Sequence, residues 1–213
     1  MSMIEQATIG VLALQGDFRE HAAMLESLGA RVVKVRRPSE LAGLDGIVLP
    51  GGESTTMIKL LDAFELEQPL REAIAAGLPA YGSCAGLILL ADRLEDGIEG
   101  QRTLGGLDVT ARRNSFGRQV DSSEAWLSAP ALGADVAAGQ APVHAVFIRA
   151  PWIEQTGPAV QVLASVDTPA GQRAVAVRQG HLLATSFHPE VSSDTRVHGL
   201  FLEMVRQSAQ AAR

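Results

Sequence analysis

The residue best suited to do chemistry in this sequence is its single cysteine, Cys84. Gly82 and Gly86 stand two positions before and after it, and apolar residues lead into and out of the motif. This spacing is typical of a nucleophile elbow, a sharp turn from a strand into a helix that presents one side chain. Glycines suit such a tight bend, and the helix N-terminus favours the reactive thiolate. The alternative is a buried structural thiol, the commoner role of a lone cysteine.

A cysteine nucleophile needs a base, and the base needs a group that orients it. Among the five histidines, only His188 has an acidic residue, Glu190, two positions away. In extended chain this spacing points both side chains to one side, and the intervening Pro189 suits a strand end. Because reactive groups gather at the carboxyl ends of parallel strands, Cys84 and His188 are expected to meet. The residues predict a cysteine hydrolase acting on an acyl or amide carbon, and they leave the substrate open.

The segment from Pro50 to Glu53 is the third candidate element, because it places two glycines directly after a strand-like run. The backbone N–H of Gly52 could stabilise a developing oxyanion, with the N–H of Ala85 as the second donor. A tight turn without a chemical role explains the segment equally well. Its spacing matches neither the phosphate-binding loop nor the dinucleotide fingerprint.

Composition excludes several classes of protein. A net charge of −6 over 213 residues, without long acidic runs, argues against nucleic acid as a partner. One cysteine cannot form an internal disulfide, which fits a reducing compartment. No apolar run approaches the ~20 residues of a membrane span, and the N-terminus lacks a signal-peptide pattern. We expect a cytoplasmic protein without a metal site or cofactor, since the cysteine has no partner and His-Glu-x-x-His is absent.

The elements that must position these residues alternate between strand and helix in the first ninety or so residues. Strands are expected at residues 8–14, 31–35 and 46–49, and the elbow strand follows. Asp17 is a plausible N-cap for a helix ending near Gly29, and another helix begins near Pro69 and ends before Gly77. His21, which follows the charged pair Arg19-Glu20, is expected at the surface or at an interface. The alternation predicts βαβ units and a parallel sheet.

The second half consists of short strand-like runs separated by turn residues. They lie at residues 107–110, 124–127, 143–148, 160–165, 174–178 and 182–187, and a hairpin connection is expected at residues 168–171. A last helix follows residues 192–194, with one apolar stripe along it. No linker is evident, so residues 1–213 are expected to form a single α/β domain whose sheet runs through both halves.

The glycine pair, the elbow and the His-Pro-Glu segment, in this order, resemble the class I (triad) glutamine amidotransferases. Within that superfamily, segments over nearly the whole chain resemble the glutaminase subunits of pyridoxal 5′-phosphate synthase, the PdxT/SNO family. The segments that carry this resemblance lie at residues 10–17, 19–21, 49–55, 82–87, 113–119, 147–151 and 186–190. The sequence departs from the family pattern at Ser123 and Val191, neither of which touches the chemistry.

The resemblance implies a flavodoxin-like three-layer sandwich, with a mostly parallel central sheet and antiparallel strands in the C-terminal half. It implies hydrolysis of L-glutamine to glutamate and ammonia, with Cys84 as nucleophile, His188 as base and acid, and Glu190 as the orienting group. No cofactor is implied. The residues implied to contact glutamine are Gly51, Gly52, Glu53, Arg113, Ile148 and Arg149. Which of the charged ones contacts which end of the substrate stays open.

The resemblance also implies a partner, a (β/α)₈-barrel synthase subunit that receives the ammonia within a large hetero-oligomer. We expect this partner to dock at the turn formed by Gln15, Gly16, Asp17 and Arg19, and the free subunit to be weakly active. Two alternatives remain. One is another cysteine hydrolase of the same fold, such as an intracellular peptidase or a deglycase-like protein. The other is a non-catalytic regulatory binding module with Cys84 buried.

Overall fold

The computed structural model describes residues 6–113, 122–168 and 171–211. Five α-helices, four 3₁₀ turns and twelve strands are assigned within these ranges. In chain order they are β1 (Thr8–Leu12), α1 (Phe18–Ser27), β2 (Arg31–Val35), η1 (Pro38–Leu41), β3 (Gly46–Leu49), α2 (Ser54–Ala63), α3 (Glu67–Ala75), β4 (Ala80–Ser83), α4 (Ala85–Leu90), β5 (Ala91–Glu95), β6 (Leu107–Arg112), β7 (Ser122–Leu127), η2 (Pro130–Leu132), η3 (Val136–Ala138), β8 (Val143–Ile148), β9 (Trp152–Thr156), β10 (Gln161–Thr168), β11 (Gly171–Gln179), β12 (Leu182–Thr185), η4 (Pro189–Val191) and α5 (Arg196–Ala211).

The large sheet has a parallel centre in the spatial order β2-β1-β3-β4-β12. Beyond β12 it continues through β11, β9, β6 and β5, and β11 and β9 pair antiparallel with their neighbours. Strand β10 pairs antiparallel with β11 outside this path. Strand β12, near the C-terminal end of the sequence, therefore lies beside the elbow strand β4. The predicted α/β sheet with antiparallel strands in the C-terminal half is confirmed.

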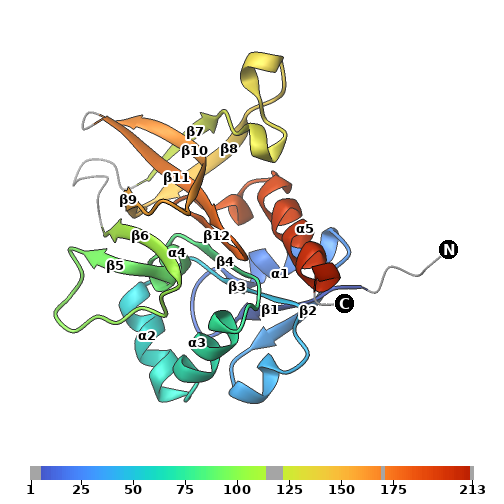
Figure 1. The fold of residues 1–213 in the computed structure, drawn as a ribbon, viewed down its shortest axis with the longest axis vertical. Helices are drawn as coiled ribbons and strands as arrows, with labels where there is room; N and C mark the ends of the chain where they lie inside the picture. Colours follow the sequence, from blue (N-terminus) through green and yellow to red (C-terminus); the bar gives the residue numbers. More distant parts are fainter. Residues whose placement is uncertain (1–5, 114–121, 169–170, 212–213) are drawn as a thin grey trace.

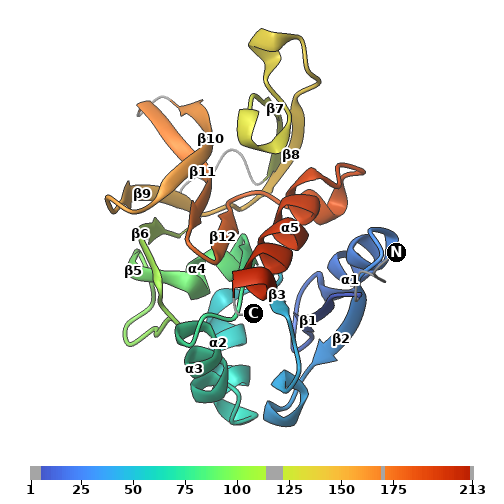
Figure 2. The same ribbon diagram turned by 45° about the vertical axis from the view of Figure 1, so that its right-hand side comes forward.

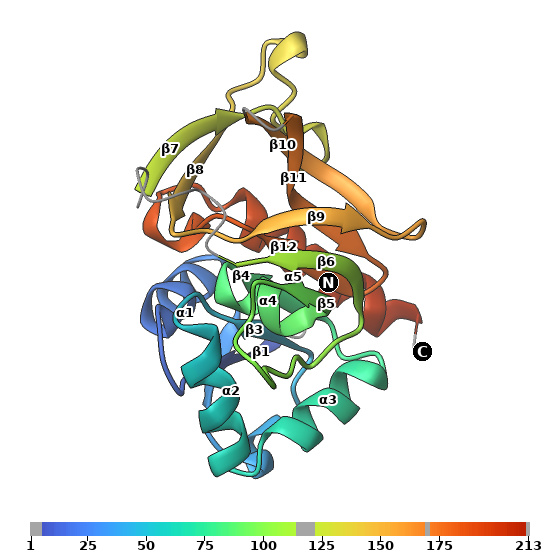
Figure 3. The same cartoon turned by 90° about the vertical axis from the view of Figure 1, so that its left-hand side faces the viewer.

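Helices cover both faces of the parallel centre and make three layers. Helices α1 and α5 contribute Leu25 and Phe201 to one buried apolar cluster. Helices α2, α3 and α4 contribute Met57, Leu70 and Leu87 to the other. Figures 1 and 3 show α2, α3 and α4 together on one side of the sheet, with α1 and α5 on the other. Within the described residues, none of the helices is long and apolar enough to cross a membrane.

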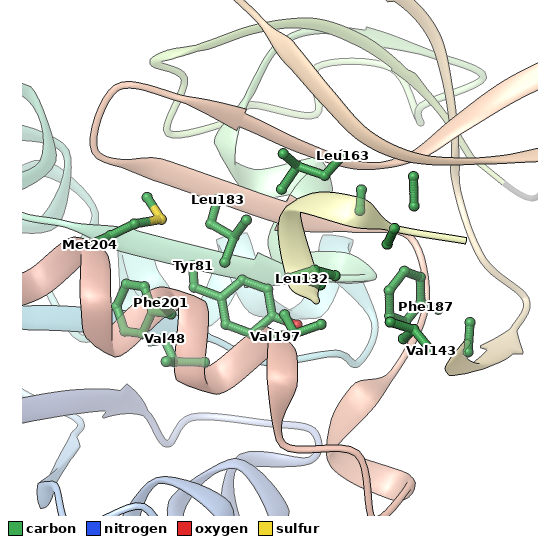
Figure 4. Close-up of a cluster of buried hydrophobic side chains, with 14 of the residues drawn as sticks. Val48, Tyr81, Leu132, Val143, Leu163, Leu183, Phe187, Val197, Phe201 and Met204 are labelled. Carbon is green, nitrogen blue, oxygen red and sulfur yellow. The ribbon is translucent and has the colours of Figure 1, made fainter. Parts of the chain in front are cut away.

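The elbow strand is anchored in the core by Tyr81, which is fully buried. Figure 4 shows its ring beside Phe201 of α5, and the two ring centroids lie 5.9 Å apart. The Tyr81 hydroxyl forms a hydrogen bond of 2.9 Å with Oγ1 of Thr185 on the neighbouring strand β12. Because Thr185 also donates to the Phe187 carbonyl oxygen, β4 and the chain after β12 are held together just before Cys84 and His188.

Strands β7 and β8 form a separate two-stranded antiparallel ribbon. Figure 2 shows it beyond one end of the central layers, joined to them through the chain after β8. On this ribbon, His144 pairs with Glu124 at 2.8 Å and stacks on Trp126. The Val146 carbonyl oxygen accepts a hydrogen bond of 2.8 Å from the His188 N–H. This bond fixes the end of β8 next to His188.

Most of the predicted elements are present, with shifted ends. The first strand ends at Leu12 rather than at residue 14, and β12 ends at Thr185 rather than at residue 187. Strands β5 and β9 and helix α2 were not predicted. Strand β5 follows the apolar run of α4 without a break. The first turn of α2 contains the β-branched residues Thr55 and Thr56, which favour loop or strand. The predicted hairpin connection at residues 168–171 is confirmed by the antiparallel pairing of β10 with β11, in which Thr168 lies opposite Gly171; residues 169–170 themselves lie outside the described residues.

Candidate active site

The site is built from loops that follow four neighbouring parallel strands. The register places Leu49 of β3 opposite Gly82 of β4, and Ser83 of β4 opposite Thr185 of β12. Strand β1 pairs with β3 through Val11. Since these strands run in the same direction, the chain after each of them emerges at the same edge of the sheet. Loops that are far apart in the sequence therefore meet around Cys84.

Cys84 has the backbone of a nucleophile elbow, with φ 48° and ψ −102° between β4 and α4. A positive φ is uncommon for a residue with a Cβ and signals a conformation that its surroundings enforce. The two flanking glycines are required by close packing. A Cβ on Gly82 would lie 2.5 Å from the Gly86 carbonyl carbon, and one on Gly86 would lie 2.0 Å from the Leu49 carbonyl oxygen. The Cys84 N–H donates to the Thr185 carbonyl oxygen at 2.8 Å.

His188 lies between Cys84 and Glu190. Its Nδ1 donates to Glu190 Oε1 at 2.7 Å, and His188 and Cys84 line the same cavity. Burial alone would lower the pKa of His188, but hydrogen bonds with Asp17, Cys84 and Glu190 raise it to about 12. A histidine in this setting is an imidazolium at neutral pH, which leaves the sulfur next to a positive charge.

The first correction concerns Asp17, which stands at the predicted N-cap position of α1 but does not cap the helix with its side chain. Its side chain makes no capping hydrogen bond to α1, and its φ of −84° and ψ of 37° are not the extended conformation of an N-cap. The carboxylate instead lies 3.4 Å from His188 Nδ1 and is 41% exposed. The position after β1 was visible in the sequence, but the local helix-capping pattern hid the contact with a residue far along the chain.

Among the described residues, Asp17, His188 and Glu190 form a grouping whose ligand atoms lie within 4.8 Å of one another. Such a grouping has donors that a metal ion could use. The same three side chains also contact one another directly, since His188 Nδ1 lies 2.7 Å from Glu190 Oε1 and 3.4 Å from Asp17 Oδ2. A hydrogen-bonded ion cluster accounts for this arrangement.

Cys84, His188 and Asp17 border a cavity of about 530 Å³. The predicted site residues that line it are Cys84, Ala85, His188, Gly52, Glu53, Arg113, Ile148 and Arg149, with Gln15, Gly16 and Asp17 of the predicted partner turn. Gly51, Glu190 and Arg19 are not part of its lining, and Glu190 lies buried behind His188. Three further residues that line the cavity, Ser54, Ile88 and Pro151, were not predicted from the sequence. Residues 114–119 of the predicted Arg-Asn-x-x-Gly-Arg-Gln segment lie outside the described residues.

The glycine loop, residues 50–53, packs tightly against His188 on one side and Gln15 on the other. A Cβ on Gly51 would lie 2.3 Å from His188 Cε1, and one on Gly52 would lie 2.4 Å from Gln15 Oε1. Gly52 also has a φ of 152°, which L side chains rarely adopt. Gln15 Oε1 accepts a hydrogen bond of 2.9 Å from the Glu53 N–H, so the turn after β1 holds the loop after β3.

At the rim of the cavity, Glu53 and Arg113 form an ion pair of 3.1 Å, in which Glu53 is 48% exposed. Arg113 also donates to Gln101 Oε1 at 2.7 Å and to Thr55 Oγ1 at 3.1 Å. Burial tends to raise the pKa of Glu53, but hydrogen bonds from Thr56 and Thr55 outweigh it and lower the pKa. Glu53 is therefore the N-cap of α2 as well as a rim residue.

His21 is the second correction. It was expected at the surface or at an interface, but it is fully buried. Its Nε2 lies 3.3 Å from Glu190 Oε1 and 2.9 Å from Ser83 Oγ. The helical period explains the difference, because His21 shares the inward side of α1 with Leu25 at i+4. The charged pair before it faces outward.

Comparison with known proteins gives a consistent result. The model of the SNO glutamine amidotransferase family matches residues 11–207. A protein of Kineococcus radiotolerans named pyridoxal 5′-phosphate synthase subunit PdxT is 63% identical over 201 residues, which cover 94% of this chain and 95% of the relative. A protein of the same name from a Nocardioides species is 57% identical over 206 residues, which cover 96% and 99%.

Among solved structures, one described as the crystal structure of glutamine amidotransferase is 43% identical. It superposes with a TM-score of 0.83 and covers 93% of this chain and 98% of its own. The structure of PurLQS from Thermotoga maritima is 17% identical with a TM-score of 0.64, and the match covers 98% of this chain and 99% of that one. At this identity it supports the fold alone. The chain belongs to the SNO glutamine amidotransferase family.

Proposed function

We propose that this protein hydrolyses L-glutamine to L-glutamate and ammonia with Cys84, His188 and Glu190, and that the ammonia is used to build pyridoxal 5′-phosphate. The observation that carries the proposal is the positive-φ elbow of Cys84, which lines one cavity with His188, while His188 pairs with the buried Glu190 at 2.7 Å. The match to the SNO glutamine amidotransferase family supports glutamine as the substrate, and relatives named as pyridoxal 5′-phosphate synthase subunits over nearly the whole chain support the pathway.

In the first half of the reaction, the Cys84 thiolate attacks the side-chain amide carbon of glutamine, and the thiol proton resides on His188. The carbonyl oxygen becomes an oxyanion, for which the N–H groups of Gly52 and Ala85 are the proposed donors. The C–N bond then breaks. His188 gives its proton to the departing nitrogen, so that ammonia leaves and a Cys84 thioester remains.

In the second half, a water molecule attacks the thioester carbon, and His188 takes one of its protons. The C–S bond breaks and releases glutamate, and the thiolate–imidazolium pair is restored. Glu190 accepts the Nδ1–H of His188 throughout. It fixes the ring orientation and stabilises the imidazolium without itself becoming protonated.

Glutamine binding is assigned to the rim and wall of the cavity, through the predicted residues Glu53, Arg113, Ile148 and Arg149. A zwitterionic amino acid needs a cation for its carboxylate and an anion for its ammonium group. Glu53 and Arg113 offer both charges side by side. Binding of glutamine would then exchange their mutual ion pair for two contacts with the substrate.

The proposed partner is a (β/α)₈-barrel synthase subunit, which takes the ammonia within a hetero-oligomer. Its proposed docking site is the turn at Gln15, Gly16, Asp17 and Arg19. The contact between Gln15 and the glycine loop supports this assignment, since a partner that moves Gln15 would also move Gly52.

The experiment is glutamate release from glutamine by the purified chain, with and without the synthase subunit, measured next to Cys84→Ala. We expect slow release alone, a large increase in kcat with the partner, and none from the variant. Turnover retained in Cys84→Ala would overturn the mechanism. Turnover of peptides or glycated thiols, without turnover of glutamine, would favour the other cysteine hydrolases. A Cys84 that reacts slowly with thiol reagents would favour a regulatory module.

A further inference from the structure

A second cluster of titratable groups lies directly behind the proposed triad, in the core. His21 of α1 and His198 of α5 are both fully buried, and Nδ1 of His21 lies 2.8 Å from Nε2 of His198. On its other side, Nε2 of His21 lies 3.3 Å from Glu190 Oε1. Two side chains that the proposed reaction does not use are therefore connected to the carboxylate that orients His188.

The surroundings leave these groups little choice of partner. Tyr81 of β4 packs edge-on against both rings, with centroid distances of 5.9 Å to His21 and 5.6 Å to His198. The hydroxyl of Tyr81 is hydrogen-bonded to Oγ1 of Thr185. Ser83, also on β4, lies 2.9 Å from Nε2 of His21.

The contacts of this cluster direct Nε2 of His21 at Ser83 Oγ, 2.9 Å away, and at Glu190 Oε1, 3.3 Å away. The other nitrogen of His21, Nδ1, shares a hydrogen bond of 2.8 Å with Nε2 of His198. Nδ1 of His198 has no hydrogen-bond partner in the described part of the chain. Burial, with His21 beside it, lowers the pKa of His198 to about 3, so His198 is the neutral member of this pair.

The same oxygen of Glu190 thus faces two imidazole nitrogens, Nδ1 of His188 at 2.7 Å and Nε2 of His21 at 3.3 Å. Its other oxygen, Oε2, is buried without a hydrogen-bond partner among the described residues. Burial raises the pKa of a carboxyl group, but His21 and His188 hold the pKa of Glu190 well below its usual range. The contact between His21 and Glu190 therefore keeps a buried carboxylate ionised and fixes the oxygen that accepts the hydrogen bond from His188.

We propose that His21, held in turn by His198, is a positioning residue for Glu190 and so for the imidazole of His188. The inference rests on the proposed function, because it extends the same Cys84–His188–Glu190 unit by one layer. It assigns His21 no contact with glutamine, since the cavity lining does not include it.

The test compares His21→Leu with His21→Gln in the complex with the synthase subunit. Leucine removes the donor, whereas glutamine keeps an N–H that can reach Glu190. We expect His21→Leu to lower kcat about 10–100-fold, the usual effect of losing an outer-layer hydrogen-bond partner, and His21→Gln to lower it less. KM for glutamine stays unchanged in both, because the rim is intact.

A pH profile separates positioning from packing. Without His21, the pKa of Glu190 rises, so the carboxylate becomes protonated at a higher pH and no longer accepts from His188. The acidic limb of kcat, and of the rate at which iodoacetamide alkylates Cys84 in the free chain, therefore moves to higher pH in His21→Leu. The charged and titratable groups that face this unit, Asp17, Cys84, Tyr81 and His198, are unchanged in the variant.

The matched control is His181→Gln, at a half-buried histidine before β12 that bonds the Ile74 carbonyl oxygen at 2.9 Å. It should leave kcat and both pH profiles unchanged. Thermal unfolding shows whether each variant is folded. If His21→Leu is unfolded, His21→Gln is compared with the wild type instead. Equal activity of wild type, His21→Leu and His21→Gln, or lowered activity with unshifted profiles, would overturn the inference. An inactive wild type would instead reject the proposed function, and the alkylation profile would still test His21.

Discussion

The two ends of the cavity hold charged groups in opposite ways. At the floor, His188 and Glu190 are buried, and the carboxylate is enclosed between two imidazoles. At the rim, Glu53 is half exposed and pairs with Arg113, which also donates to neutral side chains. Desolvated charges in fixed geometry suit bond making and breaking. Exposed charges that can exchange one partner for another suit the capture of a substrate.

Changes at the two ends of the cavity should therefore affect different kinetic constants. A change at the floor removes stabilisation that exists only in the transition state, which lowers kcat. A change at the rim removes contacts present in both the bound substrate and the transition state, which raises KM.

The strongest test of the floor is its non-additivity. We expect His188→Asn to lower kcat by about 10⁴–10⁶-fold and Glu190→Gln by about 10²–10⁴-fold, since Glu190 acts only through His188. The double variant should be little worse than His188→Asn alone. Steady-state kinetics in the complex with the synthase subunit measure all three. Losses that multiply in the double variant would mean that the two residues act independently.

The rim is tested by Arg113→Gln, which removes the cation beside Glu53. Losing one charge-assisted hydrogen bond of roughly 1.5–3 kcal/mol should raise KM for glutamine about 10–100-fold, with kcat nearly unchanged. The matched control is Arg102→Gln, because Arg102 also pairs with acidic groups, at 2.8 Å to Glu67 and 3.3 Å to Asp62, but does not line the cavity. A lowered kcat with unchanged KM in Arg113→Gln would place this residue with the floor.

The raised pKa of His188 predicts how stability depends on pH. A group whose pKa is higher in the folded state stabilises it fully below the unfolded pKa of about 6.5. That contribution is lost as pH rises toward the folded value of about 12. Urea unfolding at pH 7 and pH 9 should show a larger loss of stability in the wild type than in His188→Asn. Equal losses would mean that the floor does not hold a protonated His188.

The smallest effect separates the two roles of Glu53. Its carboxylate accepts from the Thr55 and Thr56 N–H groups at the start of α2. Glu53→Ala should therefore cost about 0.5–2 kcal/mol of stability through the lost cap, in addition to raising KM. Arg113→Gln keeps the cap and should cost less in thermal unfolding. Equal unfolding temperatures for the two variants would show that the cap contributes nothing measurable.

The segments that follow the buried parallel strands are the part of the site that the sequence could predict. Cys84, His188 and the glycine loop were predicted together because each follows a buried strand, and parallel strands end at one edge of the sheet. That argument needs only local patterns and a topology. It placed three segments correctly even though residues 84 and 188 are far apart in the chain.

The contacts that were missed have no local pattern. Asp17 occupies a position where helix capping is the usual role, and the contact with His188 overrides it. His21 follows two charged residues, and its partners His198 and Glu190 lie on elements near the other end of the chain. Their proximity depends on how α1 and α5 pack on the same face of the sheet, which side-chain periodicity alone does not specify.

The most direct test of the central claim is covalent trapping with a glutamine analogue that has an electrophilic side chain, followed by peptide mass mapping. The chain contains a single cysteine, so the reactive sulfur has one possible position. We predict a single adduct on the peptide that contains Cys84, formed far more slowly in His188→Asn and at the wild-type rate in Arg102→Gln. An adduct at any other residue, or equal rates in the wild type and His188→Asn, would contradict the account.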